Sequence, residues 1–350
     1  MKYLYALLIF VPVTIGAKMM GASETMIFLL AAAAILPLSG LLGTATEEVA
    51  GYTGSTVGGL LNATLGNFAE LVIAILALRA GLVDLVKASI TGSILGNLLL
   101  VLGASLLAGG LKYKTQRFNA NLAGMSASLL VITVVGLVVP AVFDSLHPDP
   151  THAKTRLISI YVAVVLIVGY ALSLVYSMGT HKAVFGEGGD VAHHETVPHW
   201  SLRKALTVLI VAAAAIGVMS EMLVGATEHA VASLGMSEIF VGLVIIPIIG
   251  NAAEHSSAVL MAMKNRMDLA VGIATGSSIQ VALLIAPVLV LIGAAIGVPM
   301  DLNFKPMEVA SVVLAVGIAS SVMRDNESNW LEGAFLLLVY GIIAIAFFYF

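Results

Sequence analysis

Apolar runs of about 20 residues recur along almost the whole 350-residue chain, and short polar breaks separate them. In a lipid bilayer the backbone must satisfy its own hydrogen bonds, so runs of this length form helices that cross the membrane. The longest polar stretch covers roughly residues 179–203, which leaves no room for a separate soluble domain. The apolar run after Lys2 resembles a signal peptide, but further spans follow it, so we interpret it as a retained helix.

We therefore predict an all-α polytopic membrane protein. Hydrophobic residues make up 60% of the chain and charged residues 10%, whereas about 25% of an average soluble chain is charged. Eleven transmembrane helices are expected near 3–17, 24–46, 59–79, 84–109, 120–143, 156–178, 204–226, 238–263, 269–297, 306–323 and 330–350.

One segment of this pattern occurs twice. Residues 66–95 align without a gap on residues 250–279, and eleven of the thirty aligned positions are identical. Each copy places a glutamate, Glu70 or Glu254, inside an apolar stretch. An acidic residue at the centre of a membrane helix costs at least ~2.5–3.5 kcal/mol. A chain that accepts this cost at two matched positions is expected to use both carboxylates together.

The positions of the two copies predict an inverted repeat. Glu70 falls on the third expected helix and Glu254 on the eighth, so the copies enter the membrane in opposite directions. Such repeats are typical of secondary transporters, whose site forms where the repeats meet. We predict four segments: an extra first helix over 1–20, a five-helix repeat over 21–180, a cytoplasmic His-rich linker over 181–203 and a second five-helix repeat over 204–350.

Orientation follows from the basic residues. With a cytoplasmic N-terminus, ten Lys and Arg residues lie inside and six outside, which agrees with the usual excess of positive charge on the inside. Short loops favour a cell membrane over an organelle. The sequence leaves the oligomeric state open.

The two motifs supply hard oxygen ligands. Asn67 lies three residues before Glu70, and Asn251 three before Glu254, so each pair shares a helix face. Gly66, Gly250 and the nearby Pro247 favour helix breaks that free backbone carbonyls. Carboxylates, amide oxygens and carbonyls suit Ca²⁺.

Other polar residues lie along the expected spans. The second halves of the repeats contribute Ser93, Asn97, Ser277 and Gln280, which line an ion path or serve as helix-packing residues. His255 is either an interior hydrogen-bonded histidine or a proton relay. The candidates for proton carriers are Glu47 and Glu221, which occupy the opening helix of each repeat.

The remaining acidic and histidine residues have simpler interpretations. We interpret Glu48 and Glu228 mainly as interfacial, and Asp84 and Asp268 as helix caps. The tract with His181, His193, His194 and His199 is interpreted as a solvated linker rather than a metal site.

These motifs resemble a known family. The segments 58–70 and 250–255 are similar to the two signature repeats of the cation/proton exchangers, the calcium–proton branch of the calcium/cation antiporter superfamily. The likeness continues through 45–47, 92–97, 220–221 and 325–333, and covers nearly the whole chain.

The resemblance implies eleven helices, with a five-plus-five inverted repeat behind an extra first helix. It also implies Ca²⁺ binding by Glu70 and Glu254, and proton access through Glu47 and Glu221. Two features depart from the family pattern: Phe68 replaces a small residue, and the linker is His-rich where many relatives are acidic.

The expected function is exchange of Ca²⁺ for protons by alternating access. Ca²⁺ is the transported substrate, and no cofactor is expected. Sodium coupling would need more hydroxyls and acids around the centre, and a channel would place its acids in a ring of a symmetric oligomer. An intramembrane protease would need a His-Glu-x-x-His motif or two aspartates in the membrane, so we do not expect an enzyme. Basic tracts for nucleic acid are missing, and the lipid bilayer is the expected surrounding partner.

Overall fold

The computed structural model describes residues 6–147, 151–181 and 198–349, without the side chains of residues 54–56, 59, 62 and 63. This part of the chain is nearly all helical and folds into two compact units. Seven of its helices are long and apolar enough to cross a membrane, and an eighth span is counted if Glu238–Gly250 and Ala252–Ala262 are taken as one broken helix. Leu7–Met19 and Pro306–Val322 are shorter apolar helices.

Unit 1 consists of Met1–Ser89, His193–Glu254 and Phe347–Phe350, so it draws on both halves of the sequence. Its elements are η1 (Leu7–Ile9), α2 (Phe10–Met19), α3 (Glu24–Leu65), α4 (Phe68–Arg79), α10 (Leu202–Leu234), α11 (Glu238–Phe240), η4 (Val241–Ile245), α12 (Ile246–Gly250) and the first parts of α5 (Val83–Leu95) and α13 (Ala252–Ala262).

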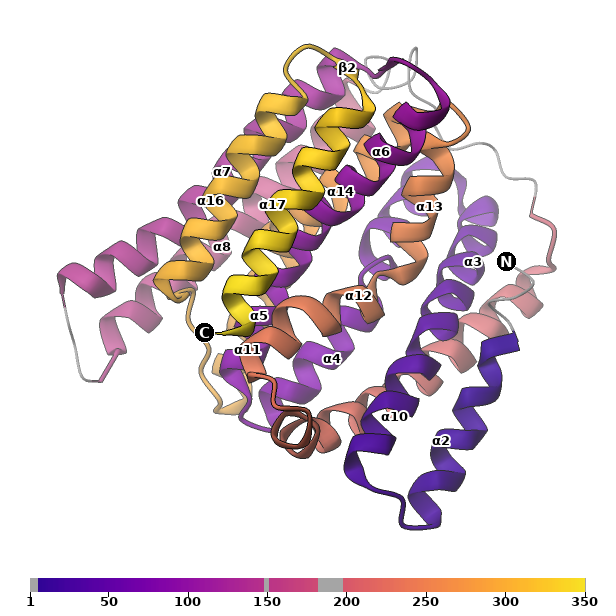
Figure 1. Cartoon of the computed structure of the whole chain (residues 1–350), viewed down its shortest axis with the longest axis vertical. Helices are drawn as coiled ribbons and strands as arrows, with labels where there is room; N and C mark the ends of the chain where they lie inside the picture. Colours follow the sequence, from indigo (N-terminus) through magenta and orange to yellow (C-terminus); the bar gives the residue numbers. More distant parts are fainter. Residues whose placement is uncertain (1–5, 148–150, 182–197, 350) are drawn as a thin grey trace. The chain divides into compact units, whose positions relative to one another are not determined.

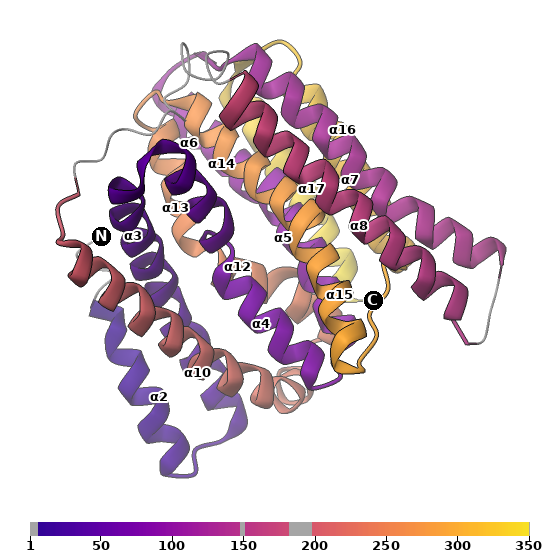
Figure 2. The same ribbon diagram turned by 180° about the vertical axis from the view of Figure 1, so that it is seen from behind.

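The longest packing contact of unit 1 joins α3 and α10. Both Figure 1 and Figure 2 show α2 and α10 beside α3. Ala31 and Ile35 of α3, with Ile216 and Met219 of α10, are fully buried. Small and branched side chains on these faces let the two helices approach closely.

Unit 2 consists of Ile90–Ala192 and His255–Ala346. In addition to the remainder of α5 and α13, its elements are η2 (Gly96–Val101), α6 (Leu102–Lys112), β1 (Gln116–Arg117), α7 (Ala120–Leu146), α8 (Ala153–Val175), η3 (Tyr176–Thr180), α14 (Met267–Gln280), η5 (Val281–Ile285), α15 (Ala286–Ile296), α16 (Pro306–Val322), β2 (Glu327–Ser328) and α17 (Trp330–Phe348). Helix α7 packs against α8, α14 and α16.

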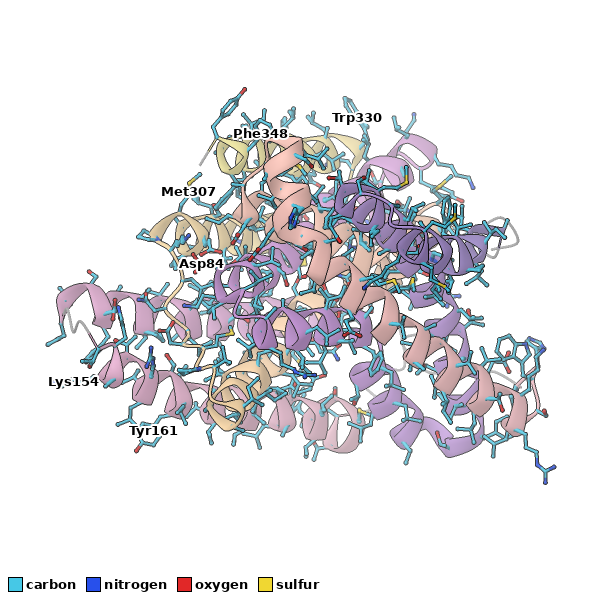
Figure 3. All side chains as sticks on the ribbon, turned by 90° about the horizontal axis from the view of Figure 1, so that it is seen from below. Asp84, Lys154, Tyr161, Met307, Trp330 and Phe348 are labelled. Carbon is cyan, nitrogen blue, oxygen red and sulfur yellow. The ribbon has the colours of Figure 1, made fainter. Side chains whose placement is uncertain are left out.

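Helix α8 shows what the outer surface of unit 2 is made of. Tyr161, Val165 and Leu172 are more than half exposed, and Figure 3 shows the Tyr161 side chain projecting away from the ribbon. Such a row of exposed apolar residues would be unfavourable in water, and it fits contact with lipid.

A two-stranded antiparallel sheet connects two loops of unit 2. Gln116 pairs with Ser328 and Arg117 with Glu327. The Arg117 and Glu327 side chains also form a salt bridge of 2.8 Å. The sequence did not predict these strands, because each is only two residues long and depends on a partner about 210 positions away.

Most helices lie close to where the apolar runs predicted them, but α3 runs without a break from Glu24 to Leu65, so the expected end near residue 46 and the expected start near residue 59 are both wrong. The expected third helix, over 59–79, is interrupted at Gly66 and Asn67, so that α4 begins at Phe68. The total of eleven helices and their inverted arrangement stay predictions. Most of the expected His-rich linker, residues 182–197 with His193 and His194, lies outside the described residues.

Candidate functional site

The first signature motif lies at a helix break in unit 1. Helix α3 ends at Leu65, and α4 begins at Phe68 after the non-helical pair Gly66 and Asn67. Glu70 is the third residue of α4 and is only 5% exposed. A carboxylate in the first turn of a helix interacts favourably with the free backbone N–H groups and the helix dipole. The break therefore creates a setting in which a buried negative charge is stabilised.

The second motif repeats this arrangement. Helix α12 ends at Gly250, Asn251 is non-helical, and α13 begins at Ala252. Glu254 is the third residue of α13 and is partly exposed. Both predicted breaks are thus present, and each places its glutamate at the same position of a helix start.

The two motifs meet inside unit 1. Asn251 Nδ2 donates a hydrogen bond to Glu70 Oε1. Gly250 lies against the same side chain, because a Cβ atom at Gly250 would be 2.8 Å from Glu70 Cγ. The second copy of the motif therefore holds the carboxylate of the first copy.

The oxygen atoms around Glu70 are suited to a hard cation. Asn67 and Asn251 are each 1% exposed. Among the described residues, Asn251 Oδ1 is buried and has no hydrogen-bond donor. A buried amide oxygen without a donor costs free energy unless a cation or a proton donor reaches it. Carboxylate and amide oxygens of this kind are the ligands that Ca²⁺ prefers.

The proposed proton carriers occupy the two helices that pack together in unit 1. Glu47 on α3 and Glu221 on α10 are both exposed in the structure. Glu48, the neighbour of Glu47, is buried, and its Oε2 accepts a hydrogen bond of 2.8 Å from the backbone N–H of Trp200. Glu48 thus has a structural partner, whereas the proton role of Glu47 and Glu221 stays a prediction.

A buried polar cluster lies in unit 2, where four of the other candidates are found. Asn97 Nδ2 donates to Ser277 Oγ at 3.0 Å, while Ser93 and Gln280 are also buried. The π-helices η2 and η5 begin at Gly96 and Val281, next to these side chains. Because π-helical turns often occur at functional sites, their position beside these side chains is consistent with a functional role of the cluster.

One member of this cluster could not be anticipated. Ser126 on α7 is buried and accepts a hydrogen bond of 3.2 Å from Thr275 Oγ1 on α14. Ser126 is one of several hydroxyl-bearing residues of α7, and nothing in the sequence sets it apart from Ser128 or Thr133.

The remaining candidates have defined surroundings. His255 follows Glu254 in α13, and its Nε2 is buried without a partner among the described residues. Asp84 and Asp268 are the second residues of α5 and α14 rather than caps. Asp268 Oδ1 also accepts from the backbone N–H of Asn119, so it fixes the start of α7.

Comparison with known proteins places the chain among ion exchangers. The model of the family described as sodium/calcium exchanger protein matches residues 23–179 and 204–349. The Ca²⁺/H⁺ antiporter of Synechocystis sp. is 45% identical, with 99% of this chain and 97% of that protein covered. The vacuolar calcium ion transporter of Schizosaccharomyces pombe is 37% identical, with 100% and 85% covered. The crystal structure of the Ca²⁺/H⁺ antiporter protein YfkE is 37% identical, with a TM-score of 0.85 and both chains fully covered.

Proposed function

The chain belongs to the sodium/calcium exchanger protein family, and from this premise we propose that it is a secondary antiporter that exchanges Ca²⁺ for H⁺ across a membrane. The names of its relatives support this substrate pair, since the Synechocystis protein is a Ca²⁺/H⁺ antiporter at 45% identity. These relatives are transporters rather than enzymes, and Ca²⁺ is their cargo rather than a cofactor.

The observation that carries the proposal for the site is the hydrogen bond between Asn251 and Glu70. It brings residues of both motif copies together around one buried carboxylate. We infer that Glu70 and Glu254 bind either Ca²⁺ or protons, with Asn67 and Asn251 as further oxygen ligands. Glu254 lies one helical turn after Asn251, at the start of α13.

Coupling would follow from charge. Two ionised carboxylates are balanced by one Ca²⁺, and two protons neutralise them equally well. Without either, like charges face a poorly hydrated surrounding, where their repulsion is much larger than in water. The transporter is therefore expected to change access when it is loaded and to stall when it is empty. No separate coupling device is required.

The wider arrangement belongs to the same proposal. We infer two five-helix repeats of opposite orientation behind an extra first helix, alternating access, a cytoplasmic N-terminus and a cell-membrane location. Glu47 and Glu221 would pass protons to the centre, and Ser93, Asn97, Ser277, Gln280 and His255 would line the ion path.

Uptake of Ca²⁺ into proteoliposomes under an imposed pH gradient tests the function. The wild type should accumulate Ca²⁺, whereas Glu70→Gln or Glu254→Gln should abolish uptake. Glu24→Gln is the matched control, because Glu24 is an exposed residue at the start of α3 in the same unit. Robust gradient-driven uptake by the Glu70→Gln, Glu254→Gln double variant would end the proposal.

The same vesicles separate proton coupling from sodium coupling. The family description includes sodium/calcium exchangers, so an imposed Na⁺ gradient without a pH gradient is the direct comparison. Proton coupling predicts no uptake in that condition, and uptake driven by Na⁺ alone would reassign the coupling ion.

A further inference from the structure

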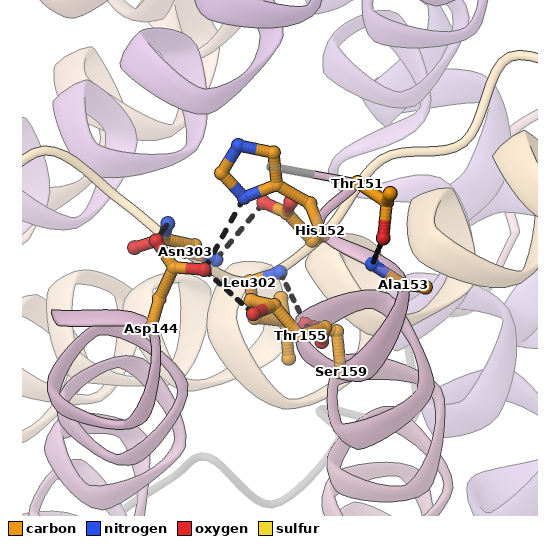
Figure 4. Close-up of polar contacts among 9 residues, drawn as sticks. Asp144, Thr151, His152, Ala153, Thr155, Ser159, Leu302 and Asn303 are labelled. Atoms are coloured by element: carbon orange, nitrogen blue, oxygen red, sulfur yellow. Dashed lines mark hydrogen bonds and ion pairs between the residues drawn. The ribbon is translucent and has the colours of Figure 1, made fainter. Parts of the chain in front are cut away.

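Three segments of unit 2 meet around one carboxylate at the end of α7. Asp144 Oδ1 accepts a hydrogen bond of 2.6 Å from Thr155 Oγ1 and lies 3.2 Å from His152 Nδ1. Asp144 Oδ2 accepts a hydrogen bond of 2.8 Å from Asn303 Nδ2. Figure 4 shows these groups converging from α7, from the start of α8 and from the loop before α16. The carboxylate therefore joins residues that are up to 159 positions apart.

The imidazole of this cluster is accessible and its backbone is constrained. His152 precedes α8 with a φ of 49°, in the left-handed region that residues other than glycine rarely adopt. Such a conformation persists only where surrounding contacts hold it. The His152 side chain is 48% exposed, whereas that of Asp144 is 18% exposed. Protons from the aqueous phase can thus reach the imidazole without passing through the protein.

A second contact fixes the same loop. The backbone N–H of Leu302 donates to Ser159 Oγ at 2.9 Å, and Ser159 is fully buried in α8. Because this amide is buried while the loop is docked, its exchange with solvent hydrogen reports directly on whether the loop stays on α8.

We propose that His152 and Asp144 form a regulatory proton-binding site, separate from the transported ions, that locks the 298–305 loop and the start of α8 onto α7. Neutral His152 makes an ordinary hydrogen bond with Asp144, since one imidazole nitrogen carries hydrogen. Protonation adds a positive charge, and a charge-assisted bond is roughly twice as strong. A lower pH in the solution around His152 therefore strengthens the contact of the loop and of α8 with α7, and a higher pH weakens it.

Other charged groups lie near His152 and Asp144 and contribute to the electrostatic potential at this pair. Lys305 lines a cavity of about 280 Å³ together with Asp144 and Asn303. The further titratable or charged groups of the described segments packed here are His147 directly after α7, Lys154 and Arg156 on α8, Asp301 in the loop and Glu308 at the start of α16. His152 Nδ1 lies 3.2 Å from Asp144 Oδ1, so a positive charge on this imidazole acts directly on the carboxylate.

The lock is placed to influence the elements that hold the polar cluster. Helix α8 packs against α15 and η5, and α7 packs against α14. Thr275 on α14 donates to Ser126 on α7. A firmer connection at the end of α7 would thus act on a helix that also packs against α14, the helix of Ser277 and Gln280, which goes beyond the proposed exchange at the glutamates.

Hydrogen–deuterium exchange on the full chain in lipid nanodiscs tests the proposal without any transport measurement. His152→Asn is the informative variant, because asparagine tolerates the left-handed backbone and keeps an N–H donor in its side chain but does not titrate. Wild type and variant are compared at about pH 5.5 and about pH 8, which bracket the range where histidine ordinarily titrates. Comparison at equal pH cancels the intrinsic pH dependence of exchange.

We expect the Leu302 amide to exchange about two- to five-fold more slowly in the wild type than in His152→Asn at the acidic pH, and equally at the alkaline pH. Lys154→Gln, which removes a neighbouring charge, should keep the wild-type pattern. Equal exchange of wild type and His152→Asn at both pH values, or the same difference at both, would overturn the proposal. These outcomes leave the proposed Ca²⁺/H⁺ exchange untouched.

Discussion

At the scale of single residues, the side chain of Glu70 is held by two neighbours from the other motif. Asn251 donates to it, and Gly250 leaves just enough space beside its Cγ. A buried carboxylate is useful as a ligand only if its position is fixed, because a displaced oxygen loses the coordination geometry. The glycine is therefore as important for the position of Glu70 as the amide is for its hydrogen bonding.

Replacing this glycine tests the point. Gly250→Ala would put a methyl group 2.8 Å from Glu70 Cγ, so the glutamate has to move. We expect a stability loss of about 1–3 kcal/mol from overpacking and a roughly tenfold lower rate of Ca²⁺ uptake, equivalent to about 1.4 kcal/mol at the site. Both are measured on purified protein, by thermal unfolding and in proteoliposomes.

The matched control is Gly225→Ala on α10, where an added Cβ meets no atom within 4 Å. It should retain stability and uptake. If Gly250→Ala shows the same stability and Ca²⁺ uptake as Gly225→Ala, the close packing of Gly250 on Glu70 contributes to neither.

The sequence predicted part of this site. It located the breaks at Gly66 and Gly250, and it singled out Glu70, Glu254 and both asparagines as candidate ligands, a role that stays a prediction; lone acids and glycines in apolar runs are visible without a structure. It did not identify the bond between Asn251 and Glu70, since residues 181 positions apart carry no mutual signal in one sequence. For the same reason the contacts of Asp144 with Asn303 and of Thr275 with Ser126 were missed.

At the scale of elements, α10 is joined to α3 near both ends of α10. Thr25 and Ser233 hydroxyls lie 2.6 Å apart. At the other end, Glu48 accepts from the backbone N–H of Trp200, and Tyr52 Oη donates to the Trp200 carbonyl oxygen at 2.6 Å. These bonds fix the start of α10, which directly follows the linker, against α3.

Loss of the Glu48 carboxylate should weaken this joint. Glu48→Ala leaves the Trp200 N–H without its charged acceptor, so we expect a loss of about 1–3 kcal/mol in the free energy of unfolding. Glu47→Ala is the control, because Glu47 is the adjacent glutamate but is exposed; it should change stability by less than about 0.5 kcal/mol. Equal stability of the two variants in thermal or denaturant unfolding would contradict this role of Glu48.

Helices α6 and α17 illustrate a contact that only glycine permits. A Cβ at Gly333 would lie 2.3 Å from Leu107 N and 2.6 Å from Gly103 O. These are backbone atoms, so no side-chain rotation relieves the clash. Small residues are what allow helices in a membrane to approach this closely.

Gly333→Ala should therefore be strongly destabilising, by about 3 kcal/mol or more. Gly341→Ala, two turns further along α17, meets nothing within 4 Å and should be nearly neutral. Thermal unfolding of the two purified variants in the same detergent makes the comparison. A Gly333→Ala protein as stable as Gly341→Ala would show that α6 and α17 can separate at no cost.

At the scale of the whole molecule, the proposed exchange depends on one set of ligands that serves two cargoes. Ca²⁺ needs deprotonated carboxylates, so proton binding and Ca²⁺ binding are linked and must weaken each other by the same factor. This linkage is a property of the whole protein at equilibrium. It is measurable without vesicles and without knowing which side a site faces.

The linkage predicts how apparent Ca²⁺ affinity changes with pH in purified protein. As pH falls and the carboxylates take up protons, the apparent Kd for Ca²⁺ should rise. If each Ca²⁺ ion displaces two protons, log Kd should increase by about two units for each unit by which the pH falls, at the acidic end of the range. The slope has this value because it equals the number of protons released when Ca²⁺ binds. Equilibrium binding of radioactive Ca²⁺ over a series of pH values measures this slope.

Variants then show which carboxyl groups release the protons when Ca²⁺ binds. Glu24→Gln should keep the steep slope, since Glu24 is exposed at the start of α3. Glu254→Gln removes one titrating ligand, so it should weaken binding and reduce the slope to about one. A Kd that does not change with pH in the wild type would separate proton from Ca²⁺ binding. The protons would then have to travel through groups other than Glu70 and Glu254, with Glu47 and Glu221 as the first candidates.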